Sequence, residues 1–153
     1  MKTGIPNLLL IVFFWLASSS CFSQNKETKA DQSINYETGN PADWPKNQDA
    51  VVAAPKNHKI LLENENVRVL QVTLKPGEVE PLHHHQWHSV LYIQSAGDFV
   101  DRDGAGNVIF DSRTLKTPLK FPITMWKDPE EPHSVKNLSK TITLRLIRVE
   151  MKK

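Results

Sequence analysis

The sequence predicts an all-β domain, a sandwich or a small barrel, and three observations support this fold class. From Asp49 onward short apolar runs alternate with turn residues, which is typical of many short strands in a sandwich or barrel. No stretch after residue 23 keeps an apolar period of 3.6 residues, so helices should be minor. The ten prolines are scattered along the chain, which also disfavours long helices.

Residues 1–23 are expected to be a signal peptide. Lys2 supplies positive charge, Leu8 to Ala17 is an unbroken apolar run of ten residues, and small residues lead to Ser23, the pattern of a cleaved export signal. Because a transmembrane helix needs about 20 apolar residues, we expect no stable membrane insertion. The mature protein should therefore be exported, either periplasmic or extracellular.

The single cysteine, Cys21, offers an alternative, namely a lipoprotein anchored through it, although Ser18 stands where such signals usually carry leucine. Simple cleavage after Ser23 removes Cys21, so any metal must be held by histidine, carboxylate or water. It also removes Lys2 and no acidic residue, so 19 basic against 17 acidic residues become 18 against 17. A net charge of +1 without a basic stripe gives no sign of a nucleic-acid partner.

Residues 24–48 are polar and are expected to be a flexible leader, with Trp44 as a loose anchor, followed by the β-domain at 49–153. Pro76-Gly77 and the loop Asp103–Asn107 are expected turns. An edge strand near residues 51–62 could pair with a second copy in a homodimer. The expected strands are 51–54, 59–62, 67–74, 87–94, 99–100, 108–110, 121–126, 134–135 and 141–150, the last with a β-bulge, or burial on both faces, where its alternation changes phase at Leu146-Ile147.

Four of the six histidines lie within residues 83–88, which suggests a site because neutral imidazole is the commonest protein metal ligand. On a strand His83 and His85 share one face while His84 points away. A third ligand must come from elsewhere. His133 follows a proline turn into an apolar pair, whereas His58 lies in a polar context typical of a surface, so His133 is the better candidate.

These residues resemble the cupins, small double-stranded β-helix or jelly-roll barrels with a metal in the barrel mouth. The spacing from Gly77 to His83 and His85, with Gly97 as a closing glycine, resembles the first cupin motif. His133 after a proline and Asn137 four residues later resemble the second motif. The resemblance covers about residues 50–151, and it implies a jelly-roll fold with His83, His85 and His133 as metal ligands.

The sequence departs from the cupin pattern at the motif's glutamate, which would fall at Ser89 or Val90. No acidic residue lies between His85 and Asp98. A neutral three-histidine set remains, similar to that of the cupin thiol dioxygenases, for a divalent ion such as Fe, Zn, Mn or Ni. His88 is a weaker candidate because its strand parity faces outward, and Ser89 is more suited to hydrogen-bond a water or a ligand-orienting group.

Three further residues are candidates for lining the pocket, namely Tyr92, Trp126 and Arg145, although aromatic strand residues are more often core and Arg145 could equally be solvated. Met125 and Phe99 are also candidates for lining the pocket, with a place in the core as the alternative.

We expect a small metalloenzyme of dioxygenase, isomerase or lyase type acting on a small anionic metabolite, because an uncharged ligand set leaves the ion its full positive charge. No residue stands out in the sequence as a general base. One alternative is a non-catalytic module that binds a small molecule, and another is an interaction protein with a vestigial site.

Overall fold

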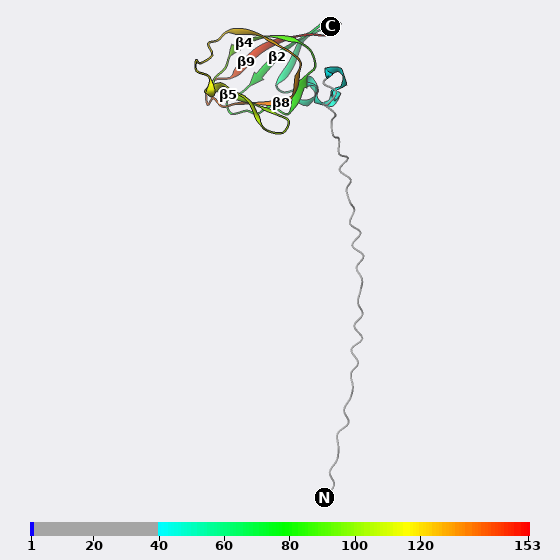
Figure 1. Ribbon diagram of the computed structural model, residues 1–153, viewed down its shortest axis with the longest axis vertical. Coiled ribbons are helices and arrows are strands. Elements are labelled where there is room, and N and C mark those ends of the chain that lie inside the picture. Colours follow the sequence, from blue (N-terminus) through cyan, green and yellow to red (C-terminus); the bar gives the residue numbers. More distant parts are fainter. Residues whose placement is uncertain (2–39) are drawn as a thin grey trace. The chain divides into compact units, whose positions relative to one another are not determined.

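Two antiparallel sheets form the domain (Figure 1), in a computed structural model that describes Met1 and residues 40–153. The predicted signal peptide, and the predicted leader up to residue 39, lie outside the described residues. One sheet has the order β1 (His58–Glu63), β2 (Val67–Leu74), β9 (Leu144–Met151), β4 (Ser89–Ser95) and β7 (Ile123–Lys127), and the other has β3 (His83–His85), β8 (Glu130–Asn137), β5 (Phe99–Asp103) and β6 (Val108–Asp111). The predicted all-β class is confirmed.

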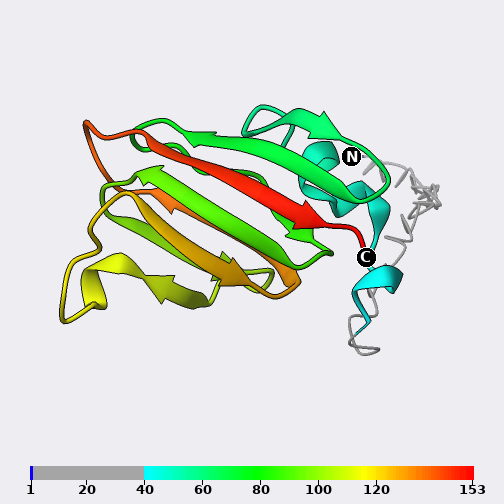
Figure 2. The ribbon, with the colours of Figure 1, turned by 90° about the horizontal axis from the view of Figure 1, so that it is seen from above.

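The hydrophobic core lies on the inward face of the five-stranded sheet. Along β2 every second side chain is buried, because neighbouring residues of a strand point to opposite faces. β4 and β9 alternate in the same way, and Phe99 and Val135 of the other sheet pack against this cluster. Figure 2 shows β2, β9 and β4 running alongside one another across the sheet. The cluster consists of Leu70, Val72, Leu74, Leu91, Ile93, Ala96, Leu144 and Leu146.

The prediction of a strand at residues 51–54 is wrong, because a short helix, α1 (Ala50–Ala53), lies there. Asp49 explains the difference, since its carboxylate accepts a hydrogen bond from the Val51 amide (3.1 Å) and so caps the helix. Three 3₁₀ helices, η2 (Pro41–Asp43), η3 (Lys46–Gln48) and η4 (Ser112–Thr114), complete the described helical elements.

The predicted irregularity at Leu146-Ile147 is also wrong. β9 itself has no bulge there: it pairs with β2 in unbroken register, and its buried positions alternate regularly. The register shift beside Leu146 lies in the partner strand β4, between Ile93 and Ser95. The apolar pattern changes phase because the inward positions switch from Leu144 and Leu146 to Arg148 and Glu150, both buried. The polar residues thus mark the end of the barrel where the site lies.

Both predicted turns form. Gly77 and Gly106 have φ angles of +76° and +87°, a conformation that favours glycine. Gly97 is required for another reason, because a Cβ there would lie 2.6 Å from the Ser139 Cβ. Asn137 ties two chain segments together, since its amide donates to the carbonyls of Leu74 (3.0 Å) and Ile142 (2.9 Å).

Residues 40–48, assigned to a flexible leader, pack on the domain where the structure describes them. Trp44 is buried, and its ring lies edge-on to His84, 5.3 Å between centroids. His84 Nε2–H donates to the Pro45 carbonyl (2.8 Å), so His84 points away from the barrel interior, as predicted, yet is covered. Among the described residues, no helix is both long and apolar enough to cross a membrane.

β1 forms one edge of the five-stranded sheet. Its residues Ile60, Leu61 and Leu62 are all exposed, so this edge could pair with another strand. The homodimer remains a prediction.

Candidate metal centre

Four imidazoles converge between the two sheets. His83 and His85 come from β3, His133 from the neighbouring strand β8, and His58 from the start of β1 in the other sheet. The His83 ring centroid lies 4.5 Å from that of His58, 5.0 Å from that of His85 and 4.7 Å from that of His133. One ligand atom from each of His58, His83 and His85 can be chosen so that all lie within 4.8 Å of one another. These three residues could hold a metal ion.

The backbone positions His83 beside His133 directly. These two residues are paired across β3 and β8, and the register then shifts so that His85 faces Glu130. Strand parity brings His83 and His85 to one face, as the sequence predicts. The pairing of β3 with β8 therefore brings His85 and His133 close in space, although they lie far apart in sequence.

In each of the four imidazoles Nδ1 is held by an oxygen. His58 Nδ1 lies 3.2 Å from the Ala54 carbonyl, and His83 Nδ1 lies 2.8 Å from the Pro81 carbonyl. An acceptor at Nδ1 fixes the proton there and leaves the Nε2 lone pair available, which is the usual orientation of a metal-ligating histidine.

The other two histidines are oriented by carboxylates. His85 Nδ1 donates to Glu150 Oε1 (2.7 Å), and His133 Nδ1 lies 3.0 Å and 3.1 Å from the two oxygens of Asp101. Nε2 of His83 and Nε2 of His133 are buried and have no hydrogen-bond partner in the part of the chain that the structure describes. Buried polar atoms are nearly always paired, so these two Nε2 atoms are available to a ligand that enters the site.

Burial also keeps the three clustered imidazoles neutral. Desolvation lowers the pKa of His58 to about 4 and that of His83 to about 2, and it lowers the pKa of His85 well below its usual value. His133 differs, since desolvation is outweighed by the hydrogen bond and charge of Asp101, which raise its pKa. Neutral imidazoles are the form that binds metals.

A carboxylate does reach the cluster, from a position that the motif does not predict. Glu80 precedes His83, and its oxygens lie 4.0 Å from His58 Nε2 and 4.0 Å from His83 Nε2. Desolvation raises the pKa of Glu80 to about 8, and its Oε2 has no hydrogen-bond partner among the described residues. Its place upstream of the His-x-His pair, on a loop, gave no signal in the sequence.

A network of buried ion pairs supports the cluster from the β9 side. Glu150 accepts hydrogen bonds from both His85 and the Arg68 Nε, and Arg68 also pairs with Asp49 (2.9 Å). Arg148 Nη1 donates to Glu130 (2.6 Å). The position of His85 is thus set by residues from β2 and β9.

The prediction that His58 lies at a polar surface is wrong, since its residue is only 4% exposed. Its flanking lysines suggested a surface, but the chain turns inward after α1, and the His58 amide donates to the Ala54 carbonyl (3.0 Å). The predicted third ligand, His133, lies beside the three-histidine group, with its ring centroid 5.8 Å from that of His85.

The two weaker candidates lie elsewhere. The His88 side chain is 52% exposed and pairs with Asp128 (3.3 Å), so it does not join the cluster. Ser89 is buried at the start of β4 opposite Glu150, but it does not line the cavity. Its hydroxyl has no hydrogen-bond partner within residues 40–153.

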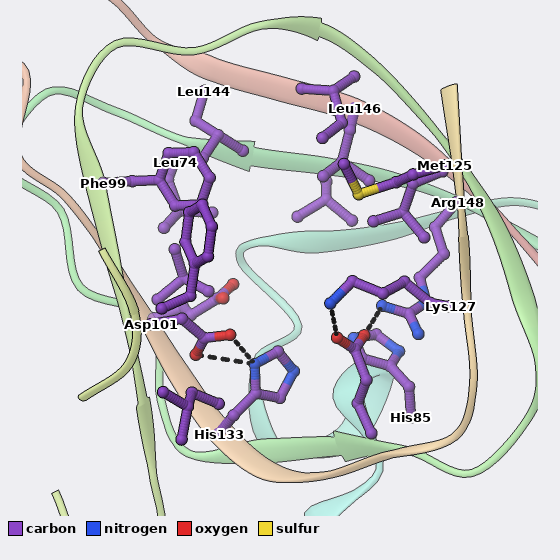
Figure 3. Close-up of a pocket in the computed structure, with 18 of the residues that line it drawn as sticks. Leu74, His85, Phe99, Asp101, Met125, Lys127, His133, Leu144, Leu146 and Arg148 are labelled. Atoms are coloured by element: carbon purple, nitrogen blue, oxygen red, sulfur yellow. Dashed lines mark hydrogen bonds and ion pairs between the residues drawn. The ribbon is translucent and has the colours of Figure 1, made fainter. Parts of the chain in front are cut away.

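A cavity of about 410 Å³ opens from the cluster into the barrel. Figure 3 shows Leu74, Phe99, Leu144 and Leu146 at one end, and His85, His133, Asp101, Lys127 and Arg148 at the other. Met125 and Phe99 line this cavity, as the sequence suggested they could.

Tyr92, Trp126 and Arg145 do not line the cavity, which corrects the prediction for all three. Each is exposed because the inward positions of its strand have the opposite parity. The neighbours Leu91, Met125 and Leu144 occupy those inward positions.

Comparison with known proteins supports the fold. No protein-family model and no curated protein matches the sequence. A cupin domain from Bordetella pertussis superposes with a TM-score of 0.52 and 21% identity, covering 63% of this chain and 92% of that domain. An RmlC-like cupin with a double-stranded β-helix fold from Methanocaldococcus jannaschii gives 0.46 and 16%, covering 61% and 77%. The polyketide cyclase RemF from Streptomyces resistomycificus gives 0.42 and 17%, covering 63% and 64%.

Proposed function

We propose that this chain, which has the double-stranded β-helix fold of the cupins, binds one divalent metal ion through His58, His83 and His85. The observation that carries the proposal is the proximity of these three histidines, whose ligand atoms all lie within 4.8 Å of one another, and each imidazole is held at Nδ1 so that its Nε2 is left for a ligand. The ion is Fe, Zn, Mn or Ni, and when bound it supplies a Lewis acid and a positive charge for an anionic ligand.

Glu80 fits this site as a fourth ligand. Its carboxylate lies 4.0 Å from the Nε2 atoms of both His58 and His83, and a bound cation would lower the cost of ionising so buried a group. Glu80 thereby supplies the carboxylate that is missing at Ser89 and Val90.

The pair of His133 and Asp101 favours an enzyme. A histidine whose Nδ1–H is held by a carboxylate is oriented to accept or deliver a proton at Nε2, and His133 lines the cavity beside the proposed ion. We therefore propose a small metalloenzyme, of dioxygenase, isomerase or lyase type, acting on a small anionic metabolite. The alternative is a non-catalytic module that binds such a molecule.

Metal analysis of protein purified without a histidine tag tests the metal centre. We expect one ion per chain in the wild type, and its loss in His83→Ala and in His85→Ala. His88→Ala is the matched control, because His88 is exposed and should leave metal content unchanged. A wild type without stoichiometric metal, and with the same thermal stability before and after chelation, contradicts the proposal.

The third ligand can be resolved by comparing His58→Ala with His133→Ala. If His58 is the ligand, its removal lowers metal affinity by at least about tenfold, while His133→Ala retains the metal and loses turnover. The reverse result for metal affinity assigns the third position to His133, as the sequence predicted.

Turnover separates the enzyme from the binding module. Dioxygen uptake and product formation are followed on iron-loaded protein with a panel of thiols and keto acids. Saturable binding without turnover identifies the non-catalytic module.

We also propose that the protein is exported. This is tested by fractionating cells and determining the N-terminus of the mature chain, which we expect at Gln24.

A further inference from the structure

The cavity beside the proposed metal has two chemically different ends. Its apolar end is formed by side chains from both sheets, among them Leu74, Phe99 and Leu144. Ile109 and Leu119 line it where the chain is partly exposed, so this part leads toward solvent. A volume of about 410 Å³ lies within the range of small-molecule sites, and an apolar lining favours a ligand with an apolar body.

Arg148 stands at the polar end with unused donors. The residue is 3% exposed and lines the cavity, and its Nη1 donates to Glu130 (2.6 Å). Its Nε lies 3.6 Å from Glu150 Oε1, and Nε and Nη2 have no hydrogen-bond partner within the described part of the chain. A buried guanidinium with unpaired N–H groups is costly, and a ligand oxygen would satisfy it.

Two of the acidic groups at this end, Glu130 and Asp101, are already paired, and the third, Glu80, is the proposed fourth ligand of the ion, so a ligand carboxylate meets positively charged partners in Arg148 and the ion. Glu130 accepts from Arg148 and from Lys127 Nζ (2.6 Å), and Asp101 is paired with His133. A divalent ion beside these pairs adds positive charge. The two oxygens of a carboxylate suit such a site, one toward the ion and one toward the guanidinium.

We propose that the cavity binds a monocarboxylic acid with an apolar body, whose carboxylate contacts Arg148 and whose hydrocarbon part lies against Leu74, Phe99 and Leu144. The proposal rests on the proposed metal centre for the second contact of the carboxylate. Arg148 is then the residue that selects an acid over an uncharged ligand of the same shape.

Calorimetric titration of zinc-loaded protein with octanoate, octanol and acetate tests this proposal. Octanoate should bind saturably, one per chain, and at least about tenfold more tightly than octanol, because a charge-assisted contact is lost with the alcohol. Acetate should bind at least about tenfold more weakly than octanoate, because it lacks the apolar body. Equal affinity for octanoate and octanol overturns the proposal.

Substitution of Arg148 shows whether this residue makes the distinction. Arg148→Met should weaken octanoate binding by about tenfold or more and leave octanol binding unchanged, and Arg148→Lys should weaken octanoate less. Arg145→Met is the matched control, since Arg145 lies on the same strand and is exposed. Should Arg148→Met fail to fold, Arg148→Lys carries the test, and octanoate affinity equal to that of the wild type then overturns the proposal.

The metal content of each sample keeps this test separate from that of the metal centre. Stoichiometric zinc without preference for octanoate overturns the acid site and leaves the proposed metal centre standing. If the wild type holds no zinc, the metal centre fails, and the titrations of metal-free wild type and Arg148→Met still decide whether Arg148 recognises the acid.

Discussion

The inward faces of the two sheets differ in chemical character: one is mainly apolar and forms the core, and the other carries the histidines of the candidate site. The inward face of the five-stranded sheet is apolar for most of its length, and β2 and β9 pair over eight residues without a shift. The inward face of the four-stranded sheet carries His83, His85 and His133, and both β3–β8 and β5–β6 contain register shifts. The five-stranded sheet also contains register shifts, at β1–β2 and at β4–β9. The two sheets therefore differ in the apolar or polar character of their inward residues, and not in the regularity of their strand pairing.

The difference teaches how a small barrel can carry a buried polar site. Apolar burial contributes about 25 cal/mol per Å², so the five-stranded sheet can offset the cost of desolvating the histidines and acids opposite it. The division is incomplete, because the far ends of β2 and β9 contribute Arg68, Arg148 and Glu150. Their charges balance and orient the polar side chains of the candidate site. Removing one of them is therefore the first test of the difference between the two sheets.

Removing Glu150 should have the largest effect. Glu150→Ala leaves the buried Arg68 and His85 without their shared acceptor, and breaking a buried ion pair costs about 3–5 kcal/mol. Urea denaturation of the metal-free protein measures the loss. Glu63→Ala is the control, since Glu63 is exposed and pairs with Lys152. Similar losses in the two variants would show that the buried network does not support the site.

A core substitution should separate stability from metal binding. Leu74→Ala removes a fully buried side chain from the apolar sheet and should lower the free energy of unfolding by about 2–5 kcal/mol. Metal affinity, measured by competition with a chelator, should stay within about twofold of the wild type. A large fall in affinity would mean that the two sheets are coupled more tightly than their separate roles imply.

Acid should destabilise the metal-free protein through its buried neutral histidines. The pKa values of His58, His83 and His85 lie below those of the unfolded chain, so the stabilising contribution is present above pH 6.5 and is lost as the pH falls toward 4. The raised pKa values of His133, Glu80 and Glu150 act in the opposite direction, because these groups bind more protons in the folded chain than in the unfolded chain. For His58 alone we expect about 2 kcal/mol between pH 7 and 5.

Thermal melts of the metal-free protein at these two pH values give the measurement. His58→Gln is the comparison, because it cannot titrate and should show a smaller pH dependence than the wild type. An identical pH dependence in both proteins would contradict the assigned role of His58.

The smallest effects are expected for side chains on the outer face of the barrel. Tyr92 is 44% and Trp126 57% exposed, so Tyr92→Ala and Trp126→Ala should change the free energy of unfolding by no more than about 0.5 kcal/mol. Octanoate affinity should be unchanged in both. A clear loss of octanoate binding in either variant would indicate that the substituted side chain lines the pocket, as the sequence suggested.

Local sequence predicted the strands well where alternation was simple and poorly where polar residues face inward. The run 67–74 became β2 because its alternation matches one buried face. At Leu146-Ile147 the same rule failed, since it assumes that the inward residues are apolar. The buried Arg148 and Glu150 break that assumption, and a change of apolar phase beside charged residues is the signal that could have indicated the site.

The sequence by itself determined the fold class and placed His83 and His85 on one face, because strand parity is a local property of the backbone. Only the tertiary structure brought His58 and Glu80 to that face, because their positions depend on the turn after α1 and on pairing between strands distant in sequence. Tertiary packing also decided that the carboxylate absent after His85 has a counterpart before His83. Burial, which no single stretch of sequence encodes, keeps the clustered imidazoles neutral and leaves N–H groups of the Arg148 guanidinium available to a ligand.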